Sequence, residues 1–465
     1  MAIFCIGVGL MTLTQRAGYL LLIVIISYIL LIYGLVYEFV ANRQRKLQPQ
    51  EAQYNTYRWI VLAVTVAMAF MGVGSRATLG VFFKAIVADL QWDRGMISAV
   101  VAVNIWLGGF LQPFTGYAMD RFGAKWLFVS SMTLFGIGVS LISLTQSFGH
   151  LLLVYGVMLA IATAGSSVSL TNALVAKWFP AHRRGFAIGI NNAGSALGQL
   201  TLVWVSTLML QLSGWRSSHV YLGLAMLIIT VPLTFLIPRG IPQTQPASTT
   251  PDRSQPRREP LATQRWSEAL NSSPLWLMNA GYFVCGMTVS LFYTHLIPFA
   301  TDRGFSPTAA ASAFGALAVC SAIGSLLSGV ASDRLGRKNI MALAYLVRGI
   351  AFVVLLTWRH ELALYVFAVL GGLSWLATPV AVMALTSEVY GMRNLATLGG
   401  ITLLVHQIGG GVSVWLAGEL HDLTGSYDVS FGLATIALFG AALVSYWIDE
   451  RRYSVRYITP LASTS

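Results

Sequence analysis

The chain has 465 residues, of which 56% are apolar and only 10% are charged, and its formal net charge at pH 7 is +12. Soluble domains carry about 25% charged residues, so this composition excludes an ordinary globular protein and indicates an all-α chain that crosses a membrane many times. The basic residues are spread over short loops, where the positive-inside rule expects them, so the net charge predicts no nucleic-acid partner.

The first long apolar stretch, 19–40, is long enough to cross a hydrocarbon core of about 30 Å as a helix. The preceding stretch, 1–14, has no basic region ahead of its apolar residues, as a cleavable signal peptide would have. We interpret 1–57 as an extra N-terminal span with a basic tether, its N-terminus outside, and expect the span to contact a protein or lipid. The alternative is a start codon assigned too far upstream; yet no methionine lies between Met11 and Met68, so a later start would cut into the next span.

Twelve further apolar stretches follow, in two groups of six. With Arg58 inside, most Lys and Arg residues fall in cytoplasmic segments, which places the linker 239–273 and the tail 451–465 inside an inner, cytoplasmic membrane. The linker is rich in Pro, Ser and Thr and separates an N-terminal half, 58–238, from a C-terminal half, 274–450. The predicted spans are 59–84, 95–119, 125–145, 150–178, 185–212, 217–237, 274–300, 308–331, 339–357, 362–388, 395–420 and 429–448.

One ten-residue motif occurs in both halves. Residues 116–125, GYAMDRFGAK, recur as 329–338, GVASDRLGRK, at a distance of 213 positions. Each copy joins two predicted spans, so the repeat indicates a duplicated bundle of helices. We expect both turns to act as conformational latches in which Asp faces a helix N-terminus, the basic residues pair with carboxylates, and Gly123 and Gly336 form the tight turn. The latch residues are Gly116, Asp120, Arg121, Gly123, Lys125, Gly329, Asp333, Arg334, Gly336, Arg337 and Lys338.

The repeated motif resembles the loop signature G-x-x-x-D-R-x-G-R-[RK] of the major facilitator superfamily, from which the first copy departs at Ala124. Residues 74–84 and 295–304 are similar to helices 1 and 7 of bacterial monocarboxylate-type transporters, relatives of the oxalate–formate exchangers. This resemblance implies two six-helix halves that give alternating access to a central site. It also implies an arginine in helix 8 that holds a substrate carboxylate; the predicted helix 308–331 has no charged residue.

Two arginines lie within predicted spans, Arg76 and Arg348, and an arginine without an acidic partner suits an anionic substrate. In the resembled fold helix 1 lines the cavity, so we expect Arg76 to bind substrate. The span 339–357 corresponds to helix 9, which lies on the periphery in that fold. Arg348 therefore has two possible roles, a functional one and hydrogen bonding to backbone carbonyls.

The other candidate site residues are polar or aromatic side chains within spans. His295 and His406 titrate near neutral pH and are candidates for proton coupling. We also expect His295, Tyr293, Asn104 and Trp375 to contact the substrate, although each of these residue types is common in helix packing.

The sequence has no phosphate-binding loop, metal-ligand cluster or nucleophile with a neighbouring base, so we expect neither enzyme activity nor a cofactor or metal. Its three cysteines lack paired spacing and are most simply packing residues. We therefore predict a secondary transporter that moves a small, monocarboxylate-like anion by proton symport or exchange. A proton-driven exporter of hydrophobic compounds and a non-transporting sensor or assembly protein remain alternatives.

Overall fold

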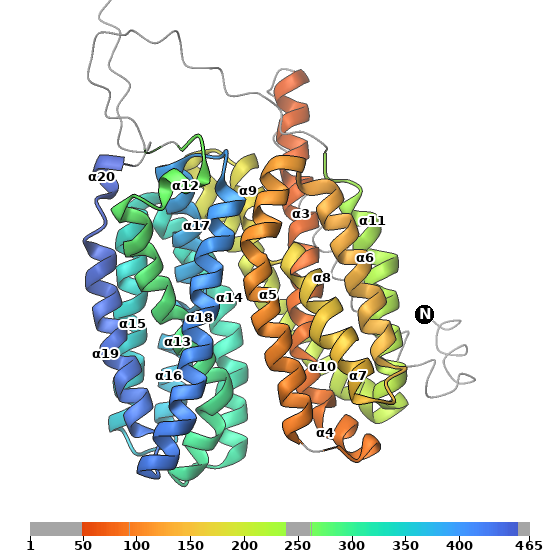
Figure 1. The fold of residues 1–465 in the computed structure, drawn as a ribbon. Coiled ribbons are helices and arrows are strands. Elements are labelled where there is room, and N and C mark those ends of the chain that lie inside the picture. Colours follow the sequence, from red (N-terminus) through yellow and green to blue (C-terminus); the bar gives the residue numbers. More distant parts are fainter. Residues whose placement is uncertain (1–48, 93, 239–260, 262, 454–465) are drawn as a thin grey trace, which may run out of the picture. The chain divides into compact units, whose positions relative to one another are not determined.

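The computed structural model describes residues 49–92, 94–238, 261 and 263–453, and every regular element in these ranges is a helix (Figure 1). The predicted extra span 19–40 and most of the linker and tail lie outside the described residues. The elements are α3 (Pro49–Ala77), α4 (Leu79–Leu90), α5 (Arg94–Phe122), α6 (Ala124–Ile142), α7 (Phe148–Leu151), η1 (Leu152–Met158), α8 (Leu159–Gly165), α9 (Val168–Trp178), η2 (Ala181–Arg183), α10 (Arg184–Ala225), η3 (Met226–Thr230), α11 (Val231–Thr234), α12 (Trp266–Ala269), α13 (Ser273–Asp302), α14 (Pro307–Leu335), α15 (Arg337–Thr357), α16 (Leu362–Trp375), α17 (Ala377–Tyr390), α18 (Leu395–Thr424), α19 (Asp428–Tyr446) and α20 (Glu450–Tyr453).

Eleven helical segments of the described chain are long and apolar enough to cross a membrane. One of them, Ala181–Thr234, has 54 residues and contains Gly214, whose positive φ of 75° interrupts the helical backbone. Glycine adopts this conformation without the steric cost that a side chain would add. The interruption lies between two stretches predicted as separate spans, 185–212 and 217–237.

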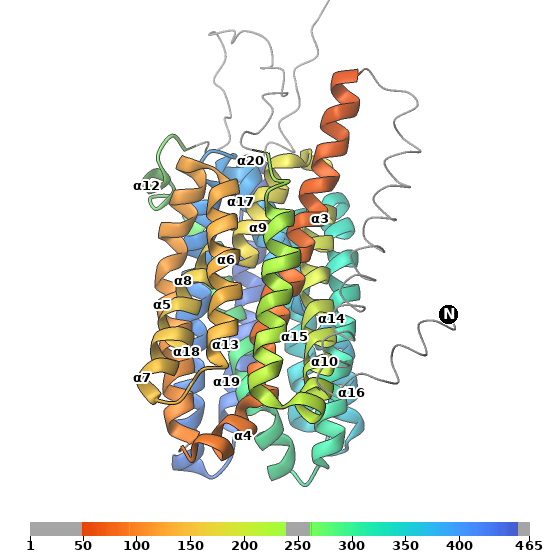
Figure 2. The same ribbon diagram turned by 90° about the vertical axis from the view of Figure 1, so that its right-hand side faces the viewer.

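The last part of the predicted tether is helical, and α3 already begins at Pro49. Glu51, Ala52 and Gln53 are good helix formers, and they continue the first span toward its N-terminus. Figure 2 shows these turns of α3 extending beyond α6 and α11 of the same bundle.

Two segments that were predicted as single spans contain a break near their middle. In Phe148–Trp178 the helix is interrupted at Ser166, after a π-helical stretch, η1. In Leu362–Tyr390 the interruption is at Leu376, between α16 and α17. The two breaks fall at comparable positions of the two sequence repeats, as expected for a duplicated architecture.

The described residues form two compact units. Unit 1 contains the described residues up to Leu111, together with Gly123–Thr171 and the segment from Gly194 to 238. Its helices pack closely where side chains are small: a β-carbon built on Gly198 of α10 would lie 2.1 Å from the carbonyl oxygen of Phe70 in α3. Such close approach is typical of small residues at helix contacts in membranes.

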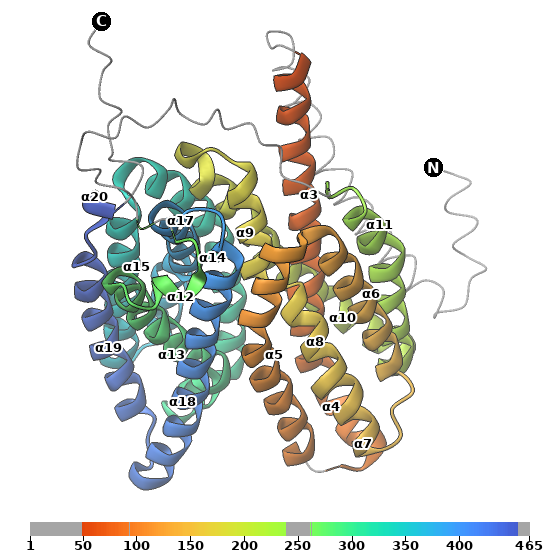
Figure 3. The same cartoon turned by 45° about the horizontal axis from the view of Figure 1, so that its top comes forward.

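Unit 2 contains Gln112–Phe122, Asn172–Ala193 and the described residues from 261 onward. In its core, α13 packs along α18 and α19, and Phe299 of α13 stacks on Phe431 of α19 at 4.4 Å between ring centroids. Figure 3 brings forward the end of this unit that carries α12 and α20. The predicted boundaries at 238 and 274 stay predictions.

Candidate functional site

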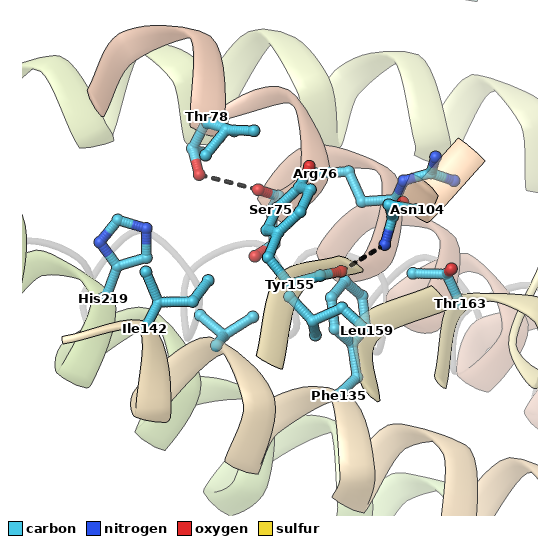
Figure 4. Close-up of a pocket in the computed structure, with 12 residues that line it drawn as sticks. Ser75, Arg76, Thr78, Asn104, Phe135, Ile142, Tyr155, Leu159, Thr163 and His219 are labelled. Atoms are coloured by element: carbon cyan, nitrogen blue, oxygen red, sulfur yellow. Dashed lines mark hydrogen bonds between the residues drawn. The ribbon is translucent and has the colours of Figure 1, made fainter. Parts of the chain in front are cut away.

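A small cavity of about 20 Å³ lies inside unit 1, enough for one water molecule. Residues of α3, α4, α5, α6, η1, α8 and α10 line it, so it lies among the helices of this bundle. Figure 4 shows Arg76 and Asn104 toward one end of the cavity, His219 at the other and Tyr155 between them. The lining residues are Ser75, Arg76, Thr78, Leu79, Asn104, Phe135, Val139, Ile142, Tyr155, Leu159, Thr163 and His219.

Arg76 lies in the last turn of α3 and is exposed. Its guanidinium makes no hydrogen bond or ion pair with the part of the chain that the structure describes. The chain turns immediately after it, where the Thr78 hydroxyl donates to the Ser75 carbonyl at 2.8 Å. The donors of Arg76 are therefore available to a ligand at the wall of this cavity.

Asn104 and His219 are both buried in the cavity wall. The Asn104 side-chain amide donates to the Tyr155 carbonyl at 2.7 Å, joining α5 to η1. The His219 Nδ1 lies 2.7 Å from the Trp215 carbonyl and therefore donates to it, which leaves Nε2 as the acceptor. His219 was not among the predicted site residues, although a histidine within the predicted span 217–237 is a sequence signal for such a role.

In unit 2, Tyr293 and Trp375 belong to one aromatic group. Their ring centroids lie 6.1 Å apart, and both rings contact Phe292, Trp375 at 4.9 Å and Tyr293 at 5.6 Å. Tyr293 is 42% exposed, whereas Trp375 is buried at the end of α16. The structure thus places these two predicted residues together, with Tyr293 as the accessible member.

The two predicted proton-coupling histidines occupy different contacts within unit 2. His295 packs against Tyr427 at 5.0 Å between centroids, and its buried Nε2 has no hydrogen-bond partner among the described residues. His406 of α18 packs against Tyr282 of α13 at 4.8 Å, and its Nδ1 lies 3.2 Å from the Gln407 amide oxygen.

Arg348 lies in α15 and is fully buried. Its Nη2 donates to the carbonyls of Ser374 and Trp375, at 2.8 and 2.9 Å. In an unbroken helix the Trp375 carbonyl would accept from residue 379, but Pro379 has no N–H. The guanidinium therefore replaces helical donors at the break between α16 and α17.

The first motif turn, with Asp120, contacts the N-terminus of α18 inside unit 2. The Asp120 carboxylate accepts from the backbone N–H of Thr397 at 2.8 Å, from its hydroxyl at 2.8 Å, and from the N–H of Ala396 at 3.3 Å. A β-carbon built on Gly116 would lie 2.3 Å from the Ala396 carbonyl oxygen, so only glycine permits this approach. The carboxylate thus neutralises orphan donors and the positive end of the helix dipole.

The second motif turn repeats this arrangement within unit 2. The Asp333 carboxylate accepts from the N–H groups of Gly185 and Phe186 at the start of α10, at 3.0 and 2.8 Å. Gly329 lies against the backbone of Gly185, as Gly116 lies against Ala396. Gly336 has a φ of 100°, and its counterpart Gly123 has a φ of 89°, as the predicted tight turns require.

The two turns neutralise their aspartates with cations from different helices. At Asp333 the cation is Arg337, which is buried, contacts Asp333 and also pairs with Glu388 at 2.9 Å. The first motif has Ala124 at the position of Arg337. There Lys177 pairs with Asp120 at 2.6 Å.

Lys177 precedes Gly185 by the same eight residues that separate Glu388 from Ala396, so Lys177 and Glu388 are repeat counterparts. The charge pattern is therefore exchanged between the two copies. In the second copy an arginine follows the turn and a glutamate lies on the facing helix; in the first copy an alanine follows the turn and a lysine lies on the facing helix.

The prediction that Arg121, Lys125 and Lys338 pair with carboxylates is wrong for the described residues. Lys125 Nζ donates to the Phe235 carbonyl at 2.6 Å and Lys338 Nζ to the Tyr446 carbonyl at 3.0 Å. Both acceptors lie at the C-terminal ends of helices, where unpaired carbonyls and the helix dipole attract cations. Arg121 donates to the Tyr117 hydroxyl at 2.7 Å.

Among the described residues, no group of three or more His, Cys, Asp or Glu side chains is arranged to hold a metal ion. The polar groups that the structure does gather are a guanidinium with an amide and an imidazole around the cavity of unit 1, and carboxylates on helix N-termini in unit 2. In the first set the Asn104 amide and the His219 Nδ1 already donate to backbone carbonyls, so the donors of Arg76 are the ones that remain for a ligand. In the second set the carboxylates bind the N-terminal N–H groups of helices.

Comparison with known proteins gives a family match over most of the chain. The model of the Major Facilitator Superfamily matches residues 62–320 and 278–460. The uncharacterized MFS-type transporter YcxA of Bacillus subtilis is 27% identical over 80% of this chain and 90% of its own length. Human monocarboxylate transporter 12 is 23% identical, over 87% of this chain and 82% of its own length.

The probable sulfoacetate transporter SauU of Cupriavidus necator is 24% identical over 87% of this chain and 98% of its own length. Among solved structures, the transporter FucP in its outward conformation superposes with a TM-score of 0.63 at 16% identity, covering 84% of this chain and 99% of FucP. At this identity the structural likeness shows the fold.

Proposed function

The chain belongs to the major facilitator superfamily, and we propose that it is a secondary transporter of a small organic anion, driven by proton symport or by exchange. It is a multi-pass membrane protein, and we place it in the cytoplasmic membrane with its linker and C-terminus inside. Relatives named for monocarboxylates and sulfoacetate support an anionic substrate. The substrate that we favour carries a carboxylate.

The observation on which this proposal depends is the exposed Arg76 side chain at the wall of the cavity. A charged side chain within a membrane span is costly and usually serves a substrate or ion pathway. A guanidinium matches a carboxylate geometrically, because two parallel N–H donors meet its two oxygens. Arg76 is exposed at the cavity wall and makes no contact with the described carboxylates, so the incoming anion would supply its counter-charge.

His219 and Asn104 complete the site that we propose around Arg76. The imidazole of His219 is held by the Trp215 carbonyl, and its free nitrogen can accept a hydrogen bond from a hydroxyl of the substrate. Asn104 fixes the spacing of α5 and η1 at the cavity. In unit 2, Tyr293 offers an exposed aromatic surface for the apolar part of a substrate.

We assign the two aspartate turns the role of conformational latches. Each carboxylate binds the first N–H groups of a helix, and this contact is available only while the helix end stays beside the turn. A contact that forms in one conformation biases the equilibrium toward that conformation.

The test is uptake of labelled small carboxylates, and of sulfoacetate, by purified protein in vesicles with an inward proton gradient. Losing a charge-assisted hydrogen-bond pair costs about 1.5–3 kcal/mol, so Arg76→Gln should lower kcat/KM about 10- to 100-fold. Arg359→Gln is the matched control, because Arg359 is also exposed but lies in a loop. Unchanged uptake in Arg76→Gln would refute the assigned site, and no uptake of any anion by folded protein would refute the substrate class.

A further inference from the structure

The charge of Arg348 has no acidic partner in the part of the chain that the structure describes. The side chain is 0% exposed, and among the described residues no Asp or Glu oxygen lies within ion-pair distance of its guanidinium. Its hydrogen bonds go to two backbone carbonyls, two threonine hydroxyls and one thiol. A fully buried cation is costly unless an opposite charge or several dipoles compensate it.

Only one of these partners can itself become an anion. The Cys285 Sγ of α13 lies 3.3 Å from Nη1 of Arg348 and 3.1 Å from the Thr378 hydroxyl. A neighbouring guanidinium favours the thiolate over the thiol, because it compensates the charge that forms on sulfur. The thiol is itself buried, so water competes little for either charge.

The surroundings of Cys285 contain further groups that titrate. They are Tyr282 on its own helix, Tyr345 and Arg348 on α15, and His406 on α18; α16 and α17 contribute Trp375 and Thr378, which do not titrate. Among the described residues, no charged group of α14 or α19 interacts with the thiol.

One of these groups has an unused hydrogen-bonding atom. The fully buried Tyr345 hydroxyl has no hydrogen-bond partner among the described residues, and it lies beside Gly281, one helical turn before Cys285. The cluster therefore combines a cation, a thiol, an imidazole and an unpaired buried hydroxyl.

We propose that Cys285 is an intramembrane proton-binding site, a thiolate paired with Arg348 that takes up one proton to become a neutral thiol. The S–H bond forms from the sulfur lone pair and the incoming proton, and no electron is transferred. The proposal rests on the transport function above and supplies the proton carrier for it. His406, beside the thiol, is the group through which the proton arrives.

Protonation of Cys285 would change the interactions of Arg348 at the break in the span Leu362–Tyr390. Arg348 donates at once to Cys285 and to the Ser374 and Trp375 carbonyls that border the break. When the sulfur is neutral, the guanidinium is held by these carbonyls and by the Trp375 ring, whose centroid lies 4.9 Å away. A proton on Cys285 therefore changes how strongly the guanidinium interacts with the carbonyls of Ser374 and Trp375 at the break.

The first test is physical and does not depend on transport. In full-length protein in detergent, the ultraviolet absorption of a thiolate should be present at neutral pH in wild type and lost in Cys285→Ser. Cys320→Ser is the matched control, because Cys320 is a partly buried thiol on α14 that is not among the hydrogen-bond partners of Arg348. Arg348→Met should shift thiolate formation to higher pH. A thiolate signal that appears only at the alkaline pH of an ordinary thiol would overturn the proposal.

The second test separates coupling from transport. In vesicles, Cys285→Ser should lower proton-driven uptake at least about tenfold while exchange of internal for external substrate continues, and Cys285→Asp should restore part of the driven uptake. Full proton-driven uptake by Cys285→Ser would refute the proton site and leave the transport function standing. If wild type moves no anion at all, the proposed function fails, and the absorbance measurement still decides the state of the thiol.

Discussion

The exchanged charges at the two motif turns make a quantitative prediction for Lys177. The side chains of Lys177 and Asp120 are only 8% and 6% exposed, and their charged atoms lie 2.6 Å apart. Removing one partner of a buried pair costs about 3–5 kcal/mol, but Asp120 keeps three donors at the start of α18, so we expect about 2 kcal/mol for Lys177→Ala. Lys177→Glu should cost more, because it places two carboxylates together.

The second motif turn shows how the loss can be repaired. There the cation lies four residues after the aspartate, at the position that Ala124 occupies in the first turn, and bridges it to a glutamate. The double variant Ala124→Arg, Lys177→Glu should therefore recreate that bridge and recover at least half of the stability that Lys177→Glu loses. The contact forms across the tight turn at Gly336, between the end of α14 and the start of α15, and Gly123 makes the corresponding turn before Ala124.

Thermal unfolding in detergent, scanned at one fixed rate, measures these differences as apparent Tm. The expected order is wild type, then the double variant, then Lys177→Ala, then Lys177→Glu. Lys125→Ala is the control: Lys125 binds a single exposed carbonyl, so its loss should change Tm little. A double variant no more stable than Lys177→Glu would show that the two turns are not interchangeable and would refute the charge-exchange explanation.

Two further predictions concern single contacts. Glu361 accepts from the Ser306 backbone N–H at 2.7 Å, which lowers the pKa of its carboxyl below the ordinary value; the stability that it adds is complete above the ordinary pKa and is lost as pH falls through the lowered one. The Tm difference between wild type and Glu361→Gln should therefore shrink toward zero in acid, and a difference that grows in acid would contradict the assignment. Arg348→Met should lower Tm by removing donors from two buried carbonyls, at about 1–3 kcal/mol for each unsatisfied group. Pro379→Ala restores the helical N–H for one of them and should reduce that loss; equal losses in both backgrounds would exclude the donor-replacement role.

The large features of this fold could be predicted from sequence because membrane burial leaves a strong pattern. Long apolar stretches bounded by charged turns must be helices, since every backbone polar group has to be satisfied within the bilayer. The breaks at Ser166 and Leu376 were not predicted, although Gly165 and Ser166 at the first and Pro379 after the second are residues that weaken a helix. A proline or glycine inside a long apolar stretch also occurs in kinked but continuous helices, and the donor that Arg348 of α15 supplies at the second break is visible only in the structure.

The candidate site was only partly accessible from sequence for the same reason. Arg76 stands out as a charge in a span, and the structure places it at a cavity. Lys177 did not stand out, because a lysine at a helix end is usually solvated. The sequence shows that the first motif has alanine at position 124, but only the structure shows that Lys177 supplies the cation there.

Cys285 shows how a chemical role can depend on a partner far away in the chain. A cysteine in an apolar stretch is typically a small packing residue. Its interpretation changes when a guanidinium from α15, 63 residues later, reaches its sulfur. Pro379 deprives the Trp375 carbonyl of its helical N–H donor, and the guanidinium binds this carbonyl and the thiol together. If this reasoning is correct, the proton affinity of Cys285 depends on the helix break, and Pro379→Ala should also shift the pH at which the thiolate forms.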